Sequence, residues 1–416
     1  MKENTMEDTT LPKALPPLLQ TKWHEEGFTE ATSIQNEVFQ PITEGEDVIA
    51  ESPTGTGKTL AYVLPILQKI EADSQDLQVM ILAPSHELVM QIHQVIVDWG
   101  KELSIRSASF IGGGNVQNQK EKLKKKPHII VGSPGRVAEL IKSKKMKVHN
   151  VRTIVIDEVD QLVSREHLNT IQSIIQSTLK ERQLLFFSAT VKEETEKVGN
   201  EMMKSPKVIR VKKENTKNVE YQYIQVEQRD KVDTLRSALH ALEHEKILVF
   251  VNEITKLGEI EEKLLFKGVK VATLASDAKK QDREKALKLF RQNEVNTLMV
   301  TDVAARGLDI QNVTMVLMLD LPRDYEQFVH RSGRTGRMGK SGQVLMLTNE
   351  REVREAKQFS KRLGSEALEK SIYGGKLLSV EEQQIQQKVN KSQARPKPKG
   401  KKPLGQKKKR SLAKKK

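Results

Sequence analysis

DVIAESPTGTGKT, at residues 47–59, is the stretch that decides how this chain folds. An apolar strand ends at Ala50, a Gly-rich turn follows, and Lys58 and Thr59 open a segment whose apolar residues have helical spacing. The N–H groups of such a turn and the N-terminus of the following helix together form a concave site for phosphate. Ser52 departs from the pattern G-x-x-x-x-G-K-[ST], because it stands where the first Gly is usual. A chance turn before a surface Lys is the alternative, and the strand–turn–helix context favours a phosphate-binding loop.

The side chains of this loop have predicted roles in binding a nucleotide. Lys58 would reach the outer phosphates, and the Thr59 hydroxyl would ligate Mg²⁺. We therefore predict a nucleotide site that consists of Ser52, Pro53, Thr54, Gly55, Thr56, Gly57, Lys58 and Thr59.

Composition limits the class of protein. The chain has 416 residues and no cysteine, so its length predicts two or three domains, and disulfides and Cys-based zinc sites are excluded. It has neither an apolar run long enough to cross a bilayer nor the apolar core of a signal peptide, and we expect a soluble, cytoplasmic protein without membrane partners. The net charge is +15, but residues 391–416 hold 13 of the 70 Lys and Arg and none of the 55 Asp and Glu, which leaves +2 for the rest.

Apolar strands alternate with amphipathic helices along most of the chain. After the phosphate loop, such strands are expected at 79–84, 128–134, 153–158 and 184–190. A second series is expected at 246–252, 269–276, 296–302, 314–320 and 342–348. Nearly continuous apolar strands separated by helices predict parallel sheets that are covered on both faces, which is an α/β fold. The second series has no phosphate loop, so we expect the nucleotide to lie on the first domain and the second domain to complete its site.

These patterns divide the chain into four parts. We assign a first domain to residues 1–211, a polar linker to 212–219, a second domain to 220–370 and a basic tail to 371–416. Residues 377–389, rich in Gln and Glu, are interpreted as a short helix within the tail. Low hydrophobicity and a single sign of charge cannot offset the entropy cost of ordering, so we expect the tail to be disordered.

The pair Asp157 and Glu158 follows the apolar strand at 153–156, at the edge where open parallel sheets bind their ligands. An Asp at this place can hold Mg²⁺, and a neighbouring Glu can orient and deprotonate an attacking water. Two solvated acids at the start of a loop are the alternative. A phosphate loop in the same sheet favours the catalytic interpretation.

The segment HRSGRTGR, at 330–337, places Arg331, Arg334 and Arg337 three residues apart. On a helix or tight turn, this spacing predicts that the guanidinium groups project to one side and clamp a ligand rich in anionic oxygens. A general basic face for RNA is the alternative. The interleaved glycines would weaken an ordinary surface helix, and they favour a specific site.

Taken in order, the phosphate loop, DEVD at 157–160, SAT at 188–190 and HRSGRTGR resemble the motifs of the DEAD-box ATP-dependent RNA helicases of superfamily two, of the bacterial type. The resemblance spans roughly residues 10–350. The motif set is specific, because DNA-directed relatives usually carry different versions of the third and last motifs. The resemblance implies two tandem RecA-like parallel-sheet domains that bind ATP and Mg²⁺ and act on RNA.

The same resemblance implies roles for individual residues of the ATP site. In GFTEATSIQ, Gln35 would read adenine, and Asp309 of the second domain would contact the ribose. Thr59 and Asp157 would position the metal ion. The implied catalytic residues are Lys58, Asp157, the general base Glu158, Arg334 and Arg337, and the residues that would couple the two domains are Asp160, Ser188, Thr190 and His330.

RNA contacts are implied in both domains. The expected residues are Pro84, His86, Gly113, Gly114, Pro134, Gly135, Arg136, Arg283 and Thr301. They would grip the sugar-phosphate backbone of one strand, so low sequence specificity is expected. The bend forced on that strand would part a short duplex locally, without translocation.

The sequence departs from the family pattern at several places. Val159 replaces an Ala in the DEVD segment, where the carboxylate spacing survives and a β-branched residue suits a strand end. His86 replaces an Arg, which predicts a weaker or pH-sensitive grip on RNA. Thr10 or Leu11 stands where a Phe is usual, and Ala31 where a Pro is usual, so adenine stacking would differ.

The expected function is an ATP-dependent RNA helicase, acting as a monomer on short duplexes or RNA–protein contacts in ribosome assembly or RNA turnover. The lysine-rich tail would tether it to structured RNA, such as ribosomal RNA, although a solubilising extension is the alternative. Two other classes stay open. One is an ATP-controlled RNA clamp or annealing chaperone, and the other is a DNA-directed motor, which normally needs an additional stepping element.

Overall fold

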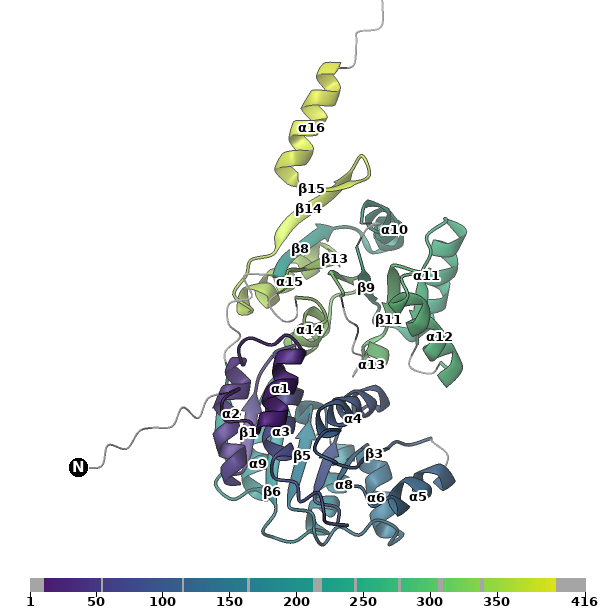
Figure 1. Ribbon diagram of the computed structural model, residues 1–416. Coiled ribbons are helices and arrows are strands. Elements are labelled where there is room, and N and C mark those ends of the chain that lie inside the picture. The colour runs from purple at the N-terminus through teal and green to yellow at the C-terminus, as the bar shows by residue number, and fades with distance from the viewer. Residues whose placement is uncertain are drawn as a thin grey trace, which may run out of the picture.

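The computed structural model describes residues 11–53, 55–113, 116–162, 165–211, 219–242, 245–275, 278–305, 310, 312–336 and 340–393. It confirms the predicted α/β class, because the described residues form two separate sheets that are covered by helices (Figure 1). In this described part, no helix is both long and apolar enough to span a bilayer.

The first sheet has seven parallel strands in the order β3-β4-β2-β5-β6-β1-β7 among the described residues. Their bounds are β1 Val48–Glu51, β2 Val79–Leu82, β3 Ser107–Phe110, β4 Ile129–Gly132, β5 Thr153–Asp157, β6 Gln183–Ser188 and β7 Lys207–Arg210. Almost every residue of the central strands is buried, since a parallel sheet is packed on both faces.

Helices cover both faces of this sheet and form two apolar cores. One core contains residues of α1 (Pro17–Glu25), α2 (Ser33–Glu44), α3 (Lys58–Leu67) and α4 (His86–Gly100). The other contains residues of α6 (Pro134–Lys142), α7 (Val159–Leu162) and α8 (Arg165–Gln176), with α5 (Val116–Lys124) and α9 (Glu193–Met202) packed at its margin.

The second sheet has the order β10-β11-β9-β12-β13-β8-β14-β15 in the described residues, and only the β14–β15 pair is antiparallel. The strands are β8 Val219–Gln225, β9 Ile247–Phe250, β10 Ala272–Leu274, β11 Thr297–Val300, β12 Met315–Met318, β13 Gly342–Thr348, β14 Leu368–Tyr373 and β15 Lys376–Ser379. The helices are α10 Lys231–Ala241, α11 Ile254–Phe266, α12 Lys280–Arg291, α13 Asp302–Ala305, α14 Tyr325–Ser332, α15 Glu350–Arg362 and α16 Val380–Gln393, with the 3-10 turn η1 at Gln228–Asp230.

The structure differs from the sequence expectation after residue 370. There the chain completes β14, turns into β15 and continues as α16, in a stretch that we expected to be a disordered tail with a helix only at 377–389. The reason is packing, because Ile372 and Leu377 lie against the core of the second domain despite their polar neighbours in the sequence. The lysine-rich residues 394–416 lie outside the described residues, as does most of the expected linker, residues 212–218.

The two domains meet at the carboxyl ends of their strands. In Figure 1, α13 and α14 of the second domain lie against the first domain, above α3 and α4. Three polar pairs join the domains there, namely His330 with Asp160, Arg283 with Glu87 and Lys192 with Glu326. Ligands of parallel sheets bind at this edge, so the interface is the place to look for the functional site.

Candidate functional site

The phosphate-binding loop is held by its own hydroxyl groups. The Thr56 hydroxyl donates to the carbonyl of Pro53 at 2.8 Å, and Ser52 Oγ lies 2.7 Å from Thr56 Oγ1. Ser52 is fully buried, and its N–H donates to the carbonyl of Ser188 on β6. Ser52 therefore links the loop to the neighbouring strand, which explains how a Ser serves where a Gly was expected.

Two glycines give the loop its shape. Gly55 and Gly57 have φ angles of 81° and 83°, in the left-handed region that side chains other than Gly rarely adopt. Gly57 caps α3, and a Cβ atom there would come within 2.5 Å of the Gln35 amide. Gln35 is buried, and its Nε2 lies 3.4 Å from the carbonyl oxygen of Gly57. The loop, the start of α3 and Gln35 thus form one unit, while Thr54 lies outside the described residues.

Asp157 ends β5 with its carboxylate in a fixed orientation. Its Oδ1 accepts the N–H of Glu158 at 2.9 Å, and its Oδ2 accepts the hydroxyl of Tyr62 at 2.9 Å. Burial raises the pKa of Asp157 to about 6, although the nearby Lys58 ammonium favours the charged form. A cation bound beside this carboxylate would favour its charged form.

Glu158 follows with a backbone conformation unusual for its residue type. Its φ angle is 51°, in the left-handed region, which is strained for a residue with a side chain. The side chain is buried, and its Oε2 accepts a hydrogen bond of 2.6 Å from Gln161. Val159 lies in the first turn of α7 and is fully buried, so its position is not the strand end that we expected.

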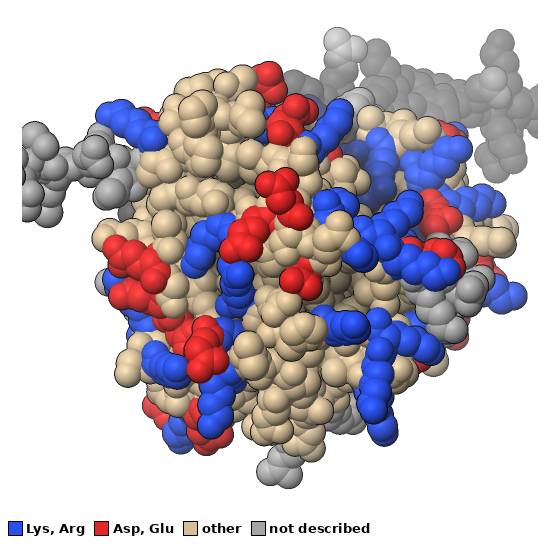
Figure 2. All heavy atoms as spheres, turned by 60° about the horizontal axis from the view of Figure 1, so that its bottom comes forward, with Lys and Arg blue, Asp and Glu red and all other residues tan. Residues whose placement is uncertain are grey.

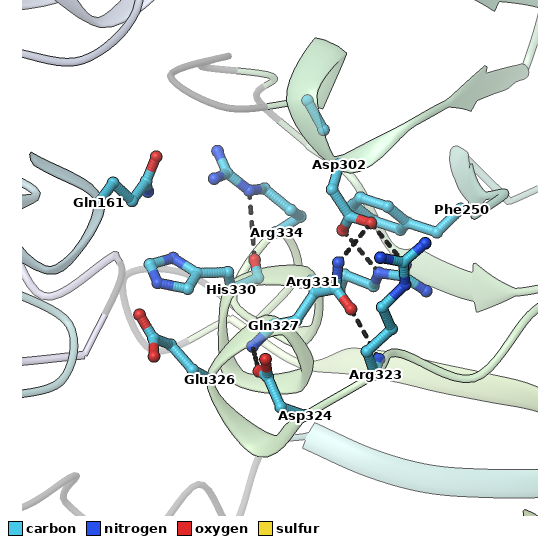
Figure 3. Close-up of a pocket in the computed structure, with 11 residues that line it drawn as sticks. Gln161, Phe250, Asp302, Arg323, Asp324, Glu326, Gln327, His330, Arg331 and Arg334 are labelled. Atoms are coloured by element: carbon cyan, nitrogen blue, oxygen red, sulfur yellow. Dashed lines mark hydrogen bonds and ion pairs between the residues drawn. The ribbon is translucent and has the colours of Figure 1, made fainter. Parts of the chain in front are cut away.

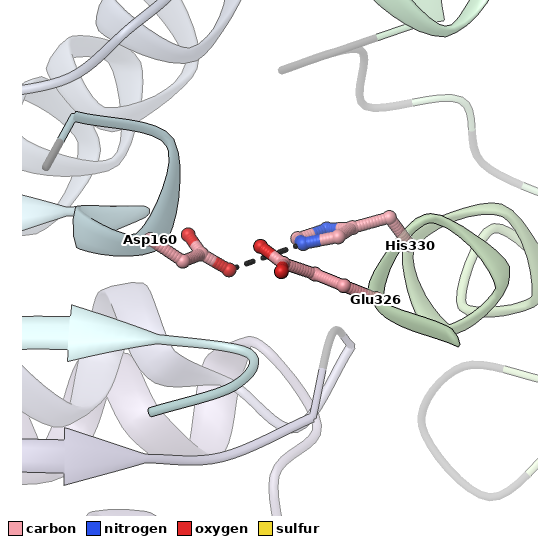
Figure 4. Close-up of side chains that lie close together, drawn as sticks. All are labelled: Asp160, Glu326 and His330. Atoms are coloured by element: carbon pink, nitrogen blue, oxygen red, sulfur yellow. Dashed lines mark hydrogen bonds and ion pairs between the residues drawn. The ribbon is translucent and has the colours of Figure 1, made fainter. Parts of the chain in front are cut away.

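The four predicted coupling residues are brought together across the domain interface. Asp160 Oδ2 lies 3.2 Å from His330 Nε2 and 3.3 Å from the Thr190 hydroxyl, and Ser188 Oγ donates to the Thr190 carbonyl at 2.6 Å. Burial of Asp160 favours its neutral form, but His330, Lys58 and Ser188 together outweigh burial and hold the pKa of Asp160 below its usual value. Asp160 and His330 come from opposite domains and point toward each other, with Glu326 beside them (Figure 4).

The arginines of the HRSGRTGR segment do not act as one group. Arg331 is fully buried, and its guanidinium donates to both oxygens of Asp302 and stacks on Phe250. The expectation that all three guanidinium groups clamp a ligand is therefore wrong for Arg331, which lines the cavity described next beside Arg334 but is bound to Asp302. Arg334 faces the same cavity, and Arg337 lies outside the described residues.

A cavity of about 300 Å³ lies at the interface beside these residues. Gln161 of the first domain faces His330 and Arg334 of the second domain across it (Figure 3). Gln161 also binds Glu158, so the cavity adjoins the carboxylates of the first domain. Asp309, the expected ribose contact, lies outside the described residues.

The expected RNA contacts lie at the same edge of both sheets. Pro84 and the exposed His86 follow β2, and a Cβ on Gly112 would be 3.8 Å from the His86 imidazole, so the loops at 84–86 and 111–113 are adjacent. Gly113 has a φ angle of 71°, and Gly114 lies outside the described residues. These loops form one continuous surface.

Other expected RNA contacts have partners within the protein. Arg283 of α12 forms an ion pair with Glu87 of α4, across the domain interface. Thr301 follows β11 and is nearly buried. Pro134 and Gly135 begin α6, but Arg136 is buried and donates to Gln119 and Glu139. Arg136 therefore fastens α6 to α5.

The sequence interpretation missed several residues of the site. Tyr62 was counted as one apolar residue of a helix, yet it binds Asp157. Glu87, Lys192 and Glu326 form ion pairs between the domains, and each partner is more than 100 residues away. Only the short-range pair Gln161 and Glu158 could have been found, from its i, i+3 spacing.

The first domain fits a nucleotide phosphate with its metal ion. Within the described residues, the buried ammonium of Lys58 has no hydrogen-bond partner. A buried ammonium whose hydrogen bonds are not made is costly, so an anion that accepts them suits this place. The carboxylate of Asp157 and the start of α3, with Thr59, supply the oxygen ligands that Mg²⁺ prefers. Together, two RecA-like domains, a phosphate loop on one and an arginine-bearing segment on the other define a nucleotide-hydrolysing protein of the helicase class.

Comparisons with known proteins agree with this class. Residues 32–198 match the DEAD/DEAH box helicase family, and residues 230–339 match the helicase conserved C-terminal domain. YfmL of Bacillus subtilis, named as a probable ATP-dependent RNA helicase, is 51% identical over 361 residues, which cover 86% of this chain and 96% of that protein. The DEAD-box ATP-dependent RNA helicase CshC of Bacillus cereus is 45% identical over 369 residues, covering 88% and 95%. The structure of S. cerevisiae Dbp5 bound to RNA and ADP BeF3 has the same fold, with a TM-score of 0.77, 24% identity and coverage of 91% and 97%.

The chain belongs to the DEAD-box ATP-dependent RNA helicases of the bacterial type. It is therefore an RNA-dependent ATPase, and the resemblance noted from its motifs is confirmed at the level of the family.

Proposed function

We propose that this chain uses ATP binding and hydrolysis to close its two domains on one RNA strand, and so unwinds short duplexes or remodels RNA–protein contacts. The observation that carries the proposal is the contact between Asp160 and His330, 170 residues apart, next to the catalytic pair of the first domain. A contact of this kind makes the hydrolytic site complete only when the domains meet.

The chain's own residues have distinct roles in the proposed reaction. Glu158 orients the attacking water and accepts its proton, and the Gln161 amide holds the Glu158 carboxylate in place. Lys58 from the first domain and Arg334 and Arg337 from the second domain stabilise charge on the transferred phosphoryl group. Mg²⁺ held by Thr59 and Asp157 would supply further charge neutralisation there.

The proposed biological setting is ribosome assembly or RNA turnover in the cytoplasm, with the protein acting as a monomer. Contacts to the RNA backbone, rather than to base edges, suit structured RNA of varied sequence. The lysine-rich residues 391–416 would add a tether whose strength falls with salt.

The test is ATP hydrolysis by wild type and Glu158→Gln, with and without RNA. Loss of the general base lowers the rate by about 10²–10⁴. Glu181→Gln, an exposed carboxylate on the same domain, is the matched control and keeps full activity. RNA-stimulated hydrolysis that survives in Glu158→Gln would overturn the assigned role.

An ATP-controlled clamp or annealing chaperone is the second candidate. His86, exposed next to Gly112, replaces a fixed positive charge in the surface proposed for RNA. A strand-annealing assay without ATP distinguishes the two functions, because a chaperone keeps its activity there and a helicase does not.

A further inference from the structure

A second concentration of positive charge lies outside the site described so far. Residues 120–147 contain ten Lys or Arg and two Glu, a net charge of +8. The other 362 of the first 390 residues contain 47 Lys or Arg and 53 Asp or Glu, a net charge of −6. The positive charge that precedes the lysine-rich tail therefore gathers in one segment.

This segment covers α5, α6 and the turns that follow them. The two helices touch, since Arg136 of α6 donates to Gln119 of α5 at 3.0 Å. The turns lead into β4 and β5, which are separated only by β2, so they share one edge of the sheet. Eight lysines are exposed on this edge, which we call the lysine edge: Lys122, Lys124, Lys125, Lys126, Lys142, Lys144, Lys145 and Lys147.

The lysine edge can be followed in the figures. Figure 2 brings the lower end of the molecule forward and shows Lys and Arg side chains gathered on the right, the side on which Figure 1 places α5 and α6 of the first domain and α11 and α12 of the second. On the left of the same view, acidic and basic side chains are mixed.

Most of this charge is not neutralised by the protein. The two acids of the segment are engaged, Glu121 with Lys124 at 2.7 Å and Glu139 with Arg136. Five lysines have neither an ion pair nor a side-chain hydrogen bond within the described residues: Lys125, Lys142, Lys144, Lys145 and Lys147. Like charges held close together repel, so an external polyanion is favoured.

The position of the edge connects it to the proposed RNA surface. α5 follows the loop that contains Gly113, and α6 begins at Pro134, so both helices start at the expected RNA contacts. With nine residues each, the helices are roughly 13 Å long at 1.5 Å per residue. RNA that leaves the proposed contact loops at 84–86 and 111–113 along these helices would reach the lysines at their far ends.

We propose that the lysine edge binds the phosphate backbone of RNA that flanks the strand gripped between the domains. The proposal rests on the function proposed above. Lysines are flexible point charges that suit a phosphate backbone of variable path. Protein-binding surfaces usually centre on aromatic or aliphatic anchors, and among the described residues no large hydrophobic side chain is exposed between 119 and 148. RNA is therefore the favoured polyanion.

The experiment removes four charges in the full chain, with Lys142, Lys144, Lys145 and Lys147 all changed to Gln. Two RNAs are compared, a single strand that only fills the groove between the domains and the same strand extended by a hairpin. The variant should bind the extended RNA about tenfold more weakly at low salt, with a salt slope reduced by about 0.9 for each phosphate that is no longer neutralised. On the short strand, its ATPase activity and the RNA concentration for half-maximal rate should match wild type.

The matched control removes four exposed lysines of the second domain, Lys256, Lys263, Lys267 and Lys270, also by change to Gln. This control should keep wild-type affinity for both RNAs. If the two variants bind the extended RNA equally well, the proposal is overturned, and an acidic protein becomes the better candidate for this edge. An equal loss on both RNAs would also overturn it, because the edge would then not be specific for flanking RNA. A wild-type chain without RNA-stimulated ATPase would contradict the proposed function instead, while binding of the two RNAs without nucleotide would still test the edge.

Discussion

At the scale of single residues, the Tyr62 hydroxyl orients the Asp157 carboxylate, which we propose as a ligand of the metal ion. Tyr62 is fully buried between Asp157, which it binds at 2.9 Å, and the ring of Phe187, whose centroid is 5.0 Å away. Burial, together with the charge of Asp157, holds the pKa of Tyr62 well above its ordinary value. The hydroxyl therefore stays protonated and donates, which leaves the carboxylate charged and oriented.

We expect Tyr62→Phe to raise the Mg²⁺ concentration needed for half-maximal ATPase activity by about tenfold. A hydrogen bond to a charged group contributes about 1.5–3 kcal/mol, and its loss frees Asp157 to rotate. Activity measured against Mg²⁺ at saturating ATP and RNA gives the result. Tyr223→Phe is the control, because its hydroxyl binds Glu369 far from the site. A Tyr62→Phe enzyme with the Mg²⁺ dependence of this control would refute the role.

The motif residues could be predicted from the sequence, because phosphate and metal binding require particular residue types at a fixed spacing. Lys58, Asp157 and Glu158 lie together in the structure as the phosphate loop and the strand end require. Tyr62 could not be predicted, since in LAYVLPIL it has the helical spacing of a core residue. Arg331 was placed with the ligand-binding arginines, because the sequence does not show that Asp302 neutralises it.

At the scale of elements, His128 joins three segments at the start of β4. Its Nδ1 accepts the N–H of Arg106, which precedes β3, and its Nε2 lies 2.9 Å from the carbonyl oxygen of Ser74, which precedes β2. Only the neutral ring with its proton on Nε2 satisfies both partners. Burial lowers the pKa of His128, and the charge of Arg106 adds to this effect, whereas the bond to Ser74 opposes it.

This arrangement predicts that the contribution of His128 to the stability of the first domain decreases as the pH falls below about 6.5, the usual pKa of His, whereas Asp157, whose pKa is raised to about 6, contributes with the opposite sign. The unfolded chain takes up a proton there that the folded His128 resists, so unfolding is favoured at lower pH, by at most about 1.4 kcal/mol per pH unit. Urea unfolding of wild type and His128→Gln between pH 5 and 8 should show a smaller slope in the variant. Part of the slope should remain, because burial also lowers the pKa of His93. The exposed His149→Gln is the control, and equal slopes in all three proteins would contradict the prediction.

Strands were predictable where burial dictated the composition, and not elsewhere. The apolar runs at 79–84 and 153–158 correspond to β2 and β5, although the final residues of each run instead form the loops of the site. β14 and β15 were missed, because their side chains are mostly half-buried and pair with each other at the sheet edge. A half-buried strand has no continuous apolar run to reveal it.

At the scale of the whole molecule, polar pairs join the two domains, and only one of the pairs found, Asp160 with His330, was expected from the motifs. Asp160 with His330, Glu87 with Arg283 and Lys192 with Glu326 are separated by more than 100 residues. The sequence predicted two domains and a nucleotide between them. The family resemblance named Asp160 and His330 as coupling residues, but neither it nor the spacing indicated the pairs Arg283 with Glu87 and Lys192 with Glu326, because such contacts depend on three-dimensional placement.

The ion pair between Lys192 and Glu326 makes closure of the two domains depend on the charges of these side chains. One carboxylate oxygen each of Glu326 and Asp160 and one ring nitrogen of His330 all lie within 4.8 Å of one another (Figure 4). Lys192 of the first domain supplies a positive charge that pairs with Glu326. Without Lys192, the carboxylates of Glu326 and Asp160 would repel and oppose closure.

We expect Lys192→Gln to raise the RNA concentration for half-maximal ATPase by up to about fivefold, since a partly exposed ion pair contributes up to about 1 kcal/mol. In a Glu326→Gln background the same change should have almost no effect, because the partner is gone. Lys197→Gln, which removes an exposed charge from α9, the helix that Lys192 precedes, is the control and should behave as wild type in both backgrounds. If Lys192→Gln costs the same with and without Glu326, the two side chains act independently, and their ion pair does not contribute to closure.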